Sequence, residues 1–290
     1  MQFIDLHCHS TASDGTDAPA AVARLAKASG LSAWALTDHD TIGGVAEAAA
    51  ESARLGIDFI PGIEISAEYP LPGTLHILGY GINPESAVLR SMTTALLAGR
   101  DNRNPRIIQR LQELNVAITM EEVEREAGKD TNSGAVVGRP HIAAILVRKG
   151  YVSSIKNAFD KYLAPGGQAY FDKERLAPRK ALQMIIESGG LPVLAHPVQL
   201  RCANDAQLET ALKNLLDMGL RGIEVIHSDH TAAHVEKYTA LAKKYRLLMT
   251  GGSDYHGMKK KEIQLGVANG RRVPRECFDA LCRVGTAHQA

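Results

Sequence analysis

The chain of 290 residues has few cysteines, no excess of charge and no long apolar run. Its four cysteines form no CxxC pair, which argues against a disulfide scaffold and favours a reducing cytoplasm. No apolar stretch reaches the roughly 20 residues of a membrane-spanning helix, and the first residues lack the basic start of a signal peptide. With 33 Lys and Arg against 32 Asp and Glu, a general electrostatic attraction to nucleic acid or membrane is not expected. We therefore expect a cytoplasmic globular protein without membrane contact and without an obligate protein partner.

Short apolar runs alternate along the chain with longer segments of helical periodicity. The runs with strand character are Phe3–Leu6, Ala33–Thr37, Phe59–Ile65, Leu75–Tyr80, Leu191–Ala195, Gly222–Ile226 and Leu247–Thr250. The helical segments between them are Ala18–Ser29, Gly44–Arg54, Arg179–Glu187, Asp205–Asp217 and Ala232–Lys244. This alternation is typical of a parallel α/β sheet, either open or closed, and seven strands would suit a barrel one strand short of the familiar eight.

The alternation stops between residues 99 and 167, where no run has strand character. We predict helices here at Pro105–Leu114, Glu121–Ala127, Pro140–Lys149 and Ser153–Tyr162. The segment carries 11 Lys and Arg against 8 Asp and Glu, so its net charge is +3. We interpret residues 99–167 as an all-helical insertion into an α/β domain made of residues 1–98 and 168–290.

Aromatic residues are scarce, with a single Trp, whereas histidine occurs 11 times, and most histidines follow predicted strands. His7 and His9 end the first strand and project to the same side, because side chains alternate along a strand. Acidic residues share this placement. The residues at or near strand ends are His7, His9, Asp14, His39, Glu64, His76, His196, Asp254 and His256. In an α/β barrel the carboxyl ends of the strands converge on one rim, so these side chains would meet in space.

Any one of these residues could be an ordinary hydrogen-bonded structural side chain. Their joint placement is harder to explain in that way, because burying so many imidazoles and carboxylates without partners is costly. Metal ions are the natural compensation, and we predict a multinuclear metal site. Imidazole and carboxylate ligands without thiolates suit Mn²⁺, Zn²⁺ or Fe²⁺.

An ordered set of motifs resembles the polymerase and histidinol phosphatase (PHP) family of metallo-phosphoesterases. The motifs are His7-Cys-His9, Asp14, Thr37-Asp-His39-Asp, Gly62-Ile-Glu64, His76, Ala195-His196-Pro and Gly252-Ser-Asp254-Tyr-His256. They extend over nearly the whole chain. The resemblance implies a distorted (β/α)7 barrel, here with a small all-helical insertion domain, and two or three divalent ions, with Mn²⁺ expected and Zn²⁺ or Fe²⁺ as alternatives.

The resemblance also implies how the ligands are shared. His7, His9, Glu64 and Asp254 would hold one ion, and Glu64, His76 and His196 a second. Asp14, His39 and His256 would hold a third ion or contact the substrate phosphate. The residues expected to take part in catalysis are Asp14, His39, Asp254 and His256.

The predicted insertion resembles that of one PHP subgroup. The matching segments are Val137-Gly-Arg139-Pro-His141-Ile-Ala, Lys149-Gly-Tyr-Val and Ala158-Phe-Asp-Lys-Tyr-Leu163. Members of this subgroup hydrolyse 3′,5′-bisphosphonucleotides such as pAp to the 5′-monophosphate, and some trim RNA from a 5′-monophosphate end. The expected partners are therefore a phosphorylated nucleotide and short single-stranded RNA 5′ ends.

A bisphosphate substrate would need a basic clamp for its second phosphate. We expect Pro105 to end the arginine-rich run before it, leaving residues 99–103 as a polar turn. Arg139, before Pro140 at a helix start, would favour an anion through both its charge and the helix dipole. His141 could instead cap that helix, and either His227 or His230 could contact phosphate. The predicted clamp residues are Arg100, Asn102, Arg103, Gly134, Arg139 and His230.

Other functions fit the same metal ligands. A phosphatase for histidinol phosphate or another small molecule, or an amidohydrolase-like deaminase or amidase, would use the same rim. A non-catalytic PHP scaffold would tolerate lost ligands, whereas every ligand position is filled here.

Overall fold

The computed structural model describes residues 2–128, 137–171 and 175–288. Its strands are β1 (Phe3–Asp5), β2 (Ala33–Leu36), β3 (Asp58–Ala67), β4 (Leu75–Tyr80), β5 (Leu191–Leu194), β6 (Gly222–Ile226), β7 (Leu248–Gly251) and β8 (Val273–Pro274). Its α-helices are α1 (Pro19–Ala28), α2 (Val45–Leu55), α3 (Ala87–Glu113), α4 (Met120–Glu126), α5 (Arg139–Arg148), α6 (Ile155–Ala158), α7 (Pro178–Glu187), α8 (Asp205–Leu216), α9 (Ala232–Tyr245) and α10 (Glu276–His288). All the predicted strands are present, whereas β8, α10 and the first half of α3 were not predicted.

The strands form one sheet in the order β7-β6-β5-β4-β3-β2-β1-β8. Strands β1 to β3 are mutually parallel, and so are β5 to β7. Strand β4 is antiparallel to both of its neighbours, and β8 is antiparallel to β1. The prediction of a parallel sheet is therefore wrong for β4, and β8 was not among the predicted strands. For β4 the reason is the short link from β3, residues 68–74, because a parallel crossover needs about a dozen residues or more.

The sheet curls until the carboxyl ends of β1 and β7 approach each other. Leu6 N donates to Gly251 O at 3.1 Å, and Asp254 N donates to His7 O at 2.9 Å. Cys8 and Tyr255 form a parallel bridge just beyond. These bonds nearly close the sheet into a barrel, which confirms the expected distorted α/β barrel and brings the residues after β7 beside those after β1.

The direction of β4 decides where His76 lies. His76 is the second residue of β4 and is paired with Ser66, near the carboxyl end of β3. In a parallel strand the same position would lie at the amino end, at the opposite mouth of the barrel. Because β4 runs backwards, its beginning lies at the rim formed by the carboxyl ends of the other strands.

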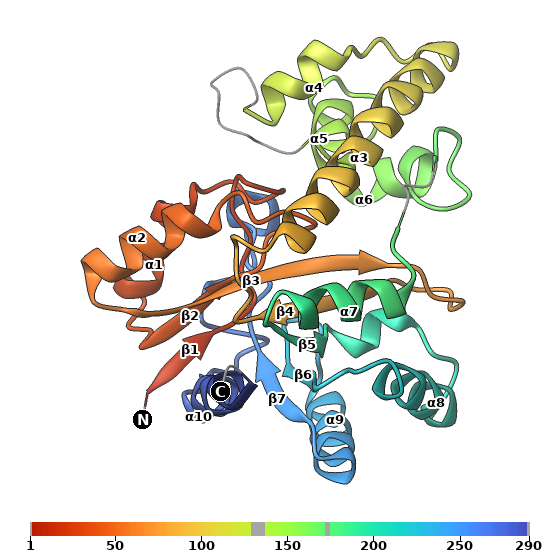
Figure 1. Ribbon diagram of the computed structural model, residues 1–290. Coiled ribbons are helices and arrows are strands. Elements are labelled where there is room, and N and C mark those ends of the chain that lie inside the picture. The colour runs from red at the N-terminus through yellow and green to blue at the C-terminus, as the bar shows by residue number, and fades with distance from the viewer. Residues whose placement is uncertain (1, 129–136, 172–174, 289–290) are drawn as a thin grey trace.

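Helices cover the barrel on two sides (Figure 1). Helices α1 and α2 pack over β2 through a cluster that includes Trp34 and Leu36, and the Trp34 Nε1 donates to Ser52 Oγ at 2.9 Å. Helices α7, α8 and α9 pack through a second cluster that contains Ile185 and Leu212. None of the helices that the structure describes combines the length and the apolar character needed to cross a bilayer.

Helix α3 connects the barrel to the helical region above it (Figure 1). Its first half contributes Leu89 and Met92 to the barrel core, and its second half contributes Ile107 and Leu111 to a separate core. The helix continues through Pro105, so the expected polar turn at residues 99–103 is wrong. A proline removes one backbone hydrogen bond from a helix, and tertiary packing on both sides compensates for that loss here.

The second core is built by α3, α4, α5 and α6. Its fully buried members include Val123, Ile142 and Leu146. Helix α4 starts with a capping box in which Thr119 Oγ1 accepts from Glu122 N and the Glu122 carboxylate accepts from Thr119 N. This region therefore has an apolar interior of its own, and the predicted division at residue 98 falls inside α3.

Candidate metal centre

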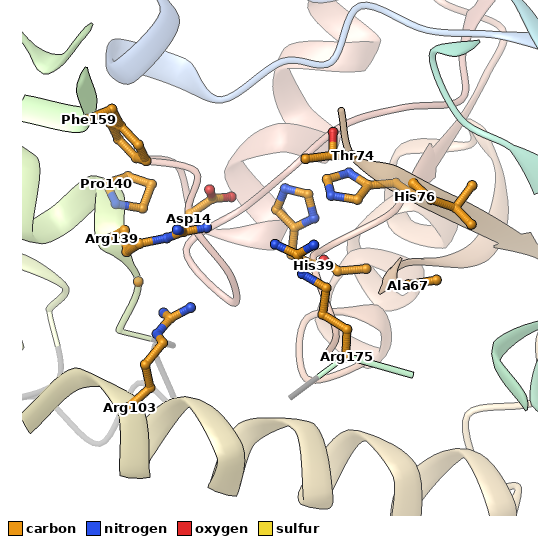
Figure 2. Close-up of a pocket in the computed structure, with 13 residues that line it drawn as sticks. Asp14, His39, Ala67, Thr74, His76, Arg103, Arg139, Pro140, Phe159 and Arg175 are labelled. Carbon is orange, nitrogen blue, oxygen red and sulfur yellow. The ribbon is translucent and has the colours of Figure 1, made fainter. Parts of the chain in front are cut away.

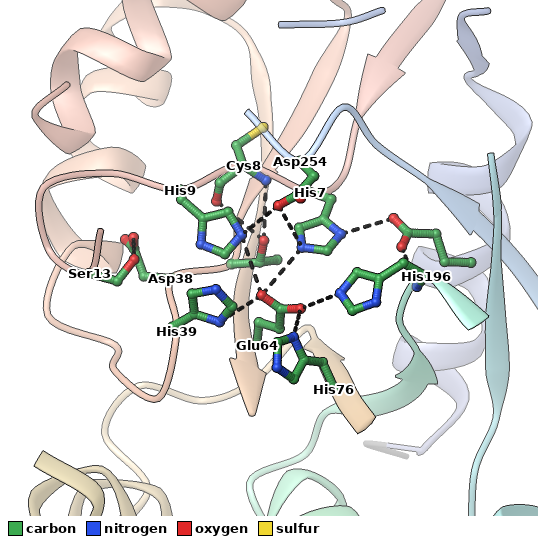
Figure 3. A network of polar contacts seen from close by, with 12 residues as sticks. His7, Cys8, His9, Ser13, Asp38, His39, Glu64, His76, His196 and Asp254 are labelled. Atoms are coloured by element: carbon green, nitrogen blue, oxygen red, sulfur yellow. Dashed lines mark hydrogen bonds and ion pairs between the residues drawn. The ribbon is translucent and has the colours of Figure 1, made fainter. Parts of the chain in front are cut away.

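The Glu64 carboxylate lies at the centre of the histidine cluster (Figure 3). It is fully buried near the carboxyl end of β3. Its Oε1 is 2.8 Å from His76 Nδ1 and 2.9 Å from His196 Nε2. Three further imidazoles lie within 3.4 Å of its Oε2, those of His7, His9 and His39. One carboxylate therefore contacts imidazoles that come from four separate strands or strand ends.

Two aspartates complete the cluster. Asp254 Oδ1 is 3.2 Å from His9 Nε2 and 3.6 Å from His7 Nε2. Asp14 Oδ1 is 3.3 Å from His256 Nε2 and 3.9 Å from His9 Nδ1. The structure thus brings together all nine residues that the sequence suggested as ligands.

Two residues of the cluster have strained backbones. His196 has a φ of 22° and Asp254 a φ of 58°, in the left-handed region that non-glycine residues rarely occupy. Hydrogen bonds hold both conformations: His196 N donates to Glu224 Oε2 at 2.7 Å, and Asp254 N donates to His7 O. Such strain persists where the surroundings fix the chain, and here it aims both side chains into the cluster.

A second layer of buried acids fixes the loops that carry the cluster. His7 Nδ1 is 3.0 Å from Glu224 Oε1, so the imidazole can present Nε2 to the centre. Asp38 accepts from Ser10 N at 2.7 Å and from Ser13 Oγ at 2.5 Å, which shapes the loop that leads to Asp14. Asp5 accepts from Ser253 N and Gly266 N, just before Asp254. These contacts pre-organise the cluster.

Burial and mutual repulsion keep part of the cluster uncharged. Burial, then the nearby His256 and His39, lower the pKa of His9 to about 3. Burial also lowers the pKa of His76 to about 4. Both imidazoles are therefore neutral at physiological pH, the form in which a histidine can bind a metal ion.

The pKa values of Glu64 and His7 shift in the direction that keeps each group charged. Burial alone would raise the pKa of Glu64, but the electrostatic effect of the neighbouring imidazoles, first that of His39, lowers it well below its usual range. For His7, burial would lower the pKa, but Glu224 and then Glu64 raise it well above its ordinary value. A cation bound at this cluster would therefore displace a proton from His7.

The donor set fits divalent cations. Within the described part of the chain, several buried atoms of the cluster make no hydrogen bond, among them His7 Nε2, both ring nitrogens of His9 and Glu64 Oε2. The groups whose ligand atoms all lie within 4.8 Å of one another are His9, Asp14, His39 and His256; His7, His227 and Asp254; His7, Glu64 and His196; and His39, Glu64 and His76. Nitrogen and oxygen donors in four overlapping groups can hold more than one ion of the Mn²⁺, Zn²⁺ or Fe²⁺ type.

A cavity of about 170 Å³ opens beside the cluster (Figure 2). Asp14, His39 and His76 line one side of it. The guanidinium groups of three arginines reach it from the other side, and they belong to Arg103, Arg139 and Arg175. The cavity therefore places three cations opposite the exposed edge of the cluster.

The predicted clamp residues do not all lie at the cavity. Arg103 and Arg139 line the cavity. The side chains of Arg100 and Asn102 lie outside the described part of the chain, and so does Gly134. His230 does not line the cavity; it is fully buried, with Nδ1 2.9 Å from Val225 O.

The structure also shows the positions of His141, in α5, and of two further arginines, Arg106 and Arg110 of α3. His141 Nδ1 accepts from Gly138 N at 3.0 Å, so this residue caps α5, as one of the two interpretations held. Arg106 and Arg110 are exposed; Arg106 lies over the Phe171 ring and Arg110 pairs with Glu113.

Sequence reasoning missed three residues of the site, Glu224, Lys260 and Arg175, and left His227 as one of two alternatives. Glu224 is an acid between two apolar residues of a strand, the same signal that identified Glu64. His227, one of two alternatives, has Nε2 3.5 Å from Asp254 Oδ2. Lys260 Nζ lies 2.6 Å from the same oxygen. Arg175 follows the predicted insertion and carries no recognisable local signal.

A barrel that gathers imidazoles and carboxylates at the carboxyl ends of its strands defines the class of metal-dependent barrel hydrolases. The PHP domain model matches residues 5–177. The chain belongs to the PHP domain family, as the motifs predicted, and is a metal-dependent phosphoesterase of that family.

Three relatives have names that specify an activity. The chain is 34% identical to the phosphoribosyl 1,2-cyclic phosphate 1,2-diphosphodiesterase of Eggerthella lenta, over 87% of this chain and 94% of that one. It is 33% identical to the 3′,5′-nucleoside bisphosphate phosphatase of Chromobacterium violaceum, over 88% of each chain. It is 31% identical to the 5′-3′ exoribonuclease Rnm of Escherichia coli, over 87% of this chain and 84% of that one.

Two solved structures share the fold over nearly their whole length. One, from Bifidobacterium adolescentis and provisionally described as a metal-dependent phosphoesterase, has a TM-score of 0.85 at 30% identity and covers 97% of this chain and 96% of that one. The other, an amidohydrolase from Chromobacterium violaceum with bound sulfate and no metal, has a TM-score of 0.83 at 32% identity, with coverage of 98% and 96%.

Proposed function

We propose that this protein hydrolyses the 3′-phosphate of 3′,5′-bisphosphonucleotides, releasing a nucleoside 5′-monophosphate such as AMP together with inorganic phosphate. The observation that carries the proposal is the cavity shared by the cluster and three arginines. A substrate with two phosphates needs one site where the ester is cleaved and a second, cationic site for the other phosphate. A phosphatase for monophosphates would need only the first.

The arginines of the cavity are held by other groups, which favours a fixed clamp. Arg139 Nη1 donates to Leu163 O at 2.8 Å, and its guanidinium lies 5.5 Å from the centre of the Tyr170 ring. Arg103 Nη2 donates to Asn104 Oδ1 at 3.1 Å. Guanidinium groups bind phosphate oxygens in pairs, and side chains that are already ordered lose little entropy when they do so.

The start of α5 adds to this clamp. Gly138, Arg139 and Pro140 form the first turn of α5 and line the cavity. The backbone N–H groups at the start of a helix favour an anion. We propose that residues 99–167 act as a substrate-clamping insertion, with Arg175 as an additional clamp residue that follows it.

Three sets of residues would hold divalent ions. They are His7, His9, Glu64 and Asp254; Glu64, His76 and His196; and Asp14, His39 and His256. When bound, such ions lower the pKa of a water molecule and neutralise charge on the phosphoryl oxygens. We propose two or three ions, with Mn²⁺ as the first candidate and Zn²⁺ or Fe²⁺ as alternatives.

The chain's own residues would orient the reaction. Asp14 and His39 line the cavity, so they would face the phosphate that is cleaved, together with His256. Burial would raise the pKa of Asp254, but Lys260 and then His256 lower it well below its usual range. An ionised Asp254 can accept a hydrogen bond from the attacking water and so direct it toward phosphorus.

The same residues would trim short RNA with a 5′-monophosphate, because the bond broken in both reactions joins phosphorus to O3′ of the first nucleotide, although RNA presents it in a phosphodiester. The relative named 5′-3′ exoribonuclease supports this extension. We propose a phosphorylated nucleotide or a short single-stranded RNA 5′ end as the partner of the site, in the cytoplasm.

The test is a panel of phosphate esters incubated with the Mn²⁺-loaded protein. The panel contains adenosine 3′,5′-bisphosphate, its 2′,5′ isomer, histidinol phosphate, a phosphoribosyl 1,2-cyclic phosphate and an aryl phosphate. We expect the highest kcat/KM for the 3′,5′-bisphosphate. A higher value for any other ester would contradict the proposal.

Arg139→Ala tests the clamp itself. We expect kcat/KM for the bisphosphate to fall by about ten-fold or more relative to that for the aryl phosphate, because a hydrogen bond to a charged group contributes about 1.5–3 kcal/mol. Arg106→Ala, which removes an exposed arginine of the same region, is the matched control. Equal losses on both esters would remove the clamp from the mechanism.

A further inference from the structure

A second cavity lies on the other side of the candidate centre, between the barrel and the insertion. Its volume is about 550 Å³, within the range of about 300–1,000 Å³ typical of small-molecule sites. Pro140 lines both cavities, and Gly15, which follows the candidate ligand Asp14, lines the second one. The two cavities therefore lie on either side of Pro140, and the second one begins one residue beyond Asp14.

The walls of this cavity are held in place by hydrogen bonds. On the barrel side, Thr16 N donates to His256 O at 3.2 Å, and Met258 N donates to Thr16 Oγ1 at 2.9 Å. Lys259 connects the two sides, with Nζ 2.8 Å from Asp14 O and 2.7 Å from His141 Nε2. These bonds fix the walls of the cavity, and the contact of Lys259 places one wall beside the backbone of the candidate ligand Asp14.

The chemistry of the lining suits one nucleotide. Met258 and Ile155 present apolar surface, being 65% and 42% exposed, and Ala144 lies with them in the lining. Apolar side chains can pack against the flat face of a base and remove apolar area from water. Arg125 and Lys259 supply positive charge near the backbone of the ligand.

Glu126 is the one acid of the described lining, against the two cations Arg125 and Lys259. Glu126 pairs with Arg148, so its negative charge is offset outside the cavity. The lining therefore combines apolar surface for a base with net positive charge for a phosphodiester backbone.

We infer that this cavity holds the nucleotide that follows the cleaved phosphate in a 5′-phosphorylated oligonucleotide. The inference rests on the proposed function, in which the 5′-phosphate of the first nucleotide binds the arginines of the first cavity. A 3′,5′-bisphosphonucleotide ends at the cleaved phosphate and leaves the second cavity empty. An oligonucleotide continues beyond it, past Gly15, and needs a place for its next base.

The reaction on such a chain is balanced with water alone. Water oxygen adds to phosphorus, the bond from phosphorus to O3′ of the first nucleotide breaks, and O3′ takes up a proton. The phosphate remains on O5′ of the second nucleotide. The products are a nucleoside 5′-monophosphate and an oligonucleotide one residue shorter that again carries a 5′-phosphate, ready for another cycle.

The experiment compares two substrates of the Mn²⁺-loaded full chain: adenosine 3′,5′-bisphosphate and the 5′-phosphorylated dinucleotide pApA. Ala144→Trp fills the cavity, and Ala206→Trp on the exposed surface of α8 is the matched control. We expect Ala144→Trp to lower kcat/KM for pApA by at least about ten-fold relative to that for the bisphosphate. The control should leave this ratio as it is in the unaltered protein.

A second variant tests the cavity independently if Ala144→Trp does not fold. Met258→Ala removes an exposed side chain of the cavity, and Met249→Ala removes an exposed methionine on β7. Met258→Ala should lower the same ratio by several-fold, and Met249→Ala should not.

The outcomes separate the two proposals. If the unaltered protein hydrolyses the bisphosphate but the ratio does not fall in either cavity variant, the inference is overturned and the proposed function stands. Parallel losses on both substrates in Met258→Ala would place the base of the bisphosphate in this cavity and would also overturn the inference. If the unaltered protein releases no phosphate from the bisphosphate, the proposed function fails, and the inference fails with it.

Discussion

The rim of the barrel and the helical region above it position their charged side chains by different means. At the rim, most of the imidazoles and carboxylates are buried at or near strand ends, and those that line the cavity are partly exposed. Acids such as Glu224 and Asp38 fix their loops by hydrogen bonds. In the helical region, Arg103 and Arg139 project from helices and are held by a few contacts. The cluster at the rim is therefore fixed by buried acids of the barrel, whereas the proposed clamp is fixed by contacts within the helical region.

The two regions also have separate interiors. The core formed by Ile107, Ile142 and their neighbours is distinct from the clusters that fill the barrel. Helix α3 contributes to both cores, and the contact of Lys259 with His141 links them near the centre. Changes in one region should therefore alter the other mainly through these two connections, and the predictions below test that separation.

The largest effect is expected from Glu64→Gln. The substitution keeps the shape of the side chain and removes the charge that lies among five imidazoles. We expect kcat to fall by about 10²- to 10³-fold for every phosphate ester, together with a loss of bound metal measured by mass spectrometry. Glu236→Gln on the surface of α9 is the control. Full activity and metal content in Glu64→Gln would show that the rim does not work as one cluster.

Removal of metal should destabilise the barrel. Mn²⁺ present at a thousand times its dissociation constant would raise the free energy of unfolding by about 4 kcal/mol. The increase should depend on pH, because a metal ion competes with the protons on His7 and His39, whose pKa values Glu64 helps to raise against the effect of burial. His9 and His76, with pKa values of about 3 and about 4, are already neutral.

The measurement is thermal unfolding with and without Mn²⁺ at about pH 5.5 and about pH 8. Protons bind His7 and His39 more fully at the lower pH, so the metal-induced rise in Tm should be smaller there and larger at the higher pH. A larger rise at about pH 5.5 would contradict the assignment of these imidazoles as the sites that release protons.

A smaller effect is expected from Glu224→Gln, which acts behind the rim. The Glu224 carboxylate contacts His7 Nδ1 and accepts from His196 N, and it touches neither the cavity nor Glu64 in the described structure. Loss of its charge should lower activity by about 10- to 100-fold, equally for bisphosphate and aryl phosphate. A loss confined to one substrate would place Glu224 in the clamp instead.

The smallest effect is expected from Thr119→Ala in the helical region. It removes the capping box of α4 and should lower the free energy of unfolding by about 1 kcal/mol, measured with urea. Thr210→Ala, on the exposed face of α8, is the control. The affinity for Mn²⁺ should not change. A weaker affinity in Thr119→Ala would show that the two regions are more tightly coupled than their separate cores suggest.

Much of the candidate site could be predicted because its signals are local. Each acid or histidine of the cluster stands at or near the end of an apolar run, and alternation along a strand decides which side it faces. The same reasoning could have found Glu224, which is buried between apolar residues of β6. Residues without such a pattern could not be found: Arg175 reaches the cavity only through the path of the chain after the helical region.

In the helical region, local sequence signals predicted less of the structure. Its helices were predicted from caps and periodicity, but Pro105 suggested a break that α3 does not make. The local preference of proline is outweighed when packing on both halves of a helix favours continuity. For the same reason, the sequence could not decide between His227 and His230. Both follow β6 and both are buried, but only His227 lies near Asp254, whereas His230 packs against Tyr238 of α9.

By itself, the order of residues determined which side chains could serve as ligands, the alternation of strands and helices and the family to which the chain belongs. These depend on neighbours a few positions away. The three-dimensional arrangement decided that β4 runs backwards and delivers His76 to the rim, that the barrel closes at β1 and β7, and that three arginines share one cavity with the cluster. Each of these features depends on contacts between segments that are distant in the sequence. Such contacts form because they bury apolar surface, and no local sequence pattern predicts them.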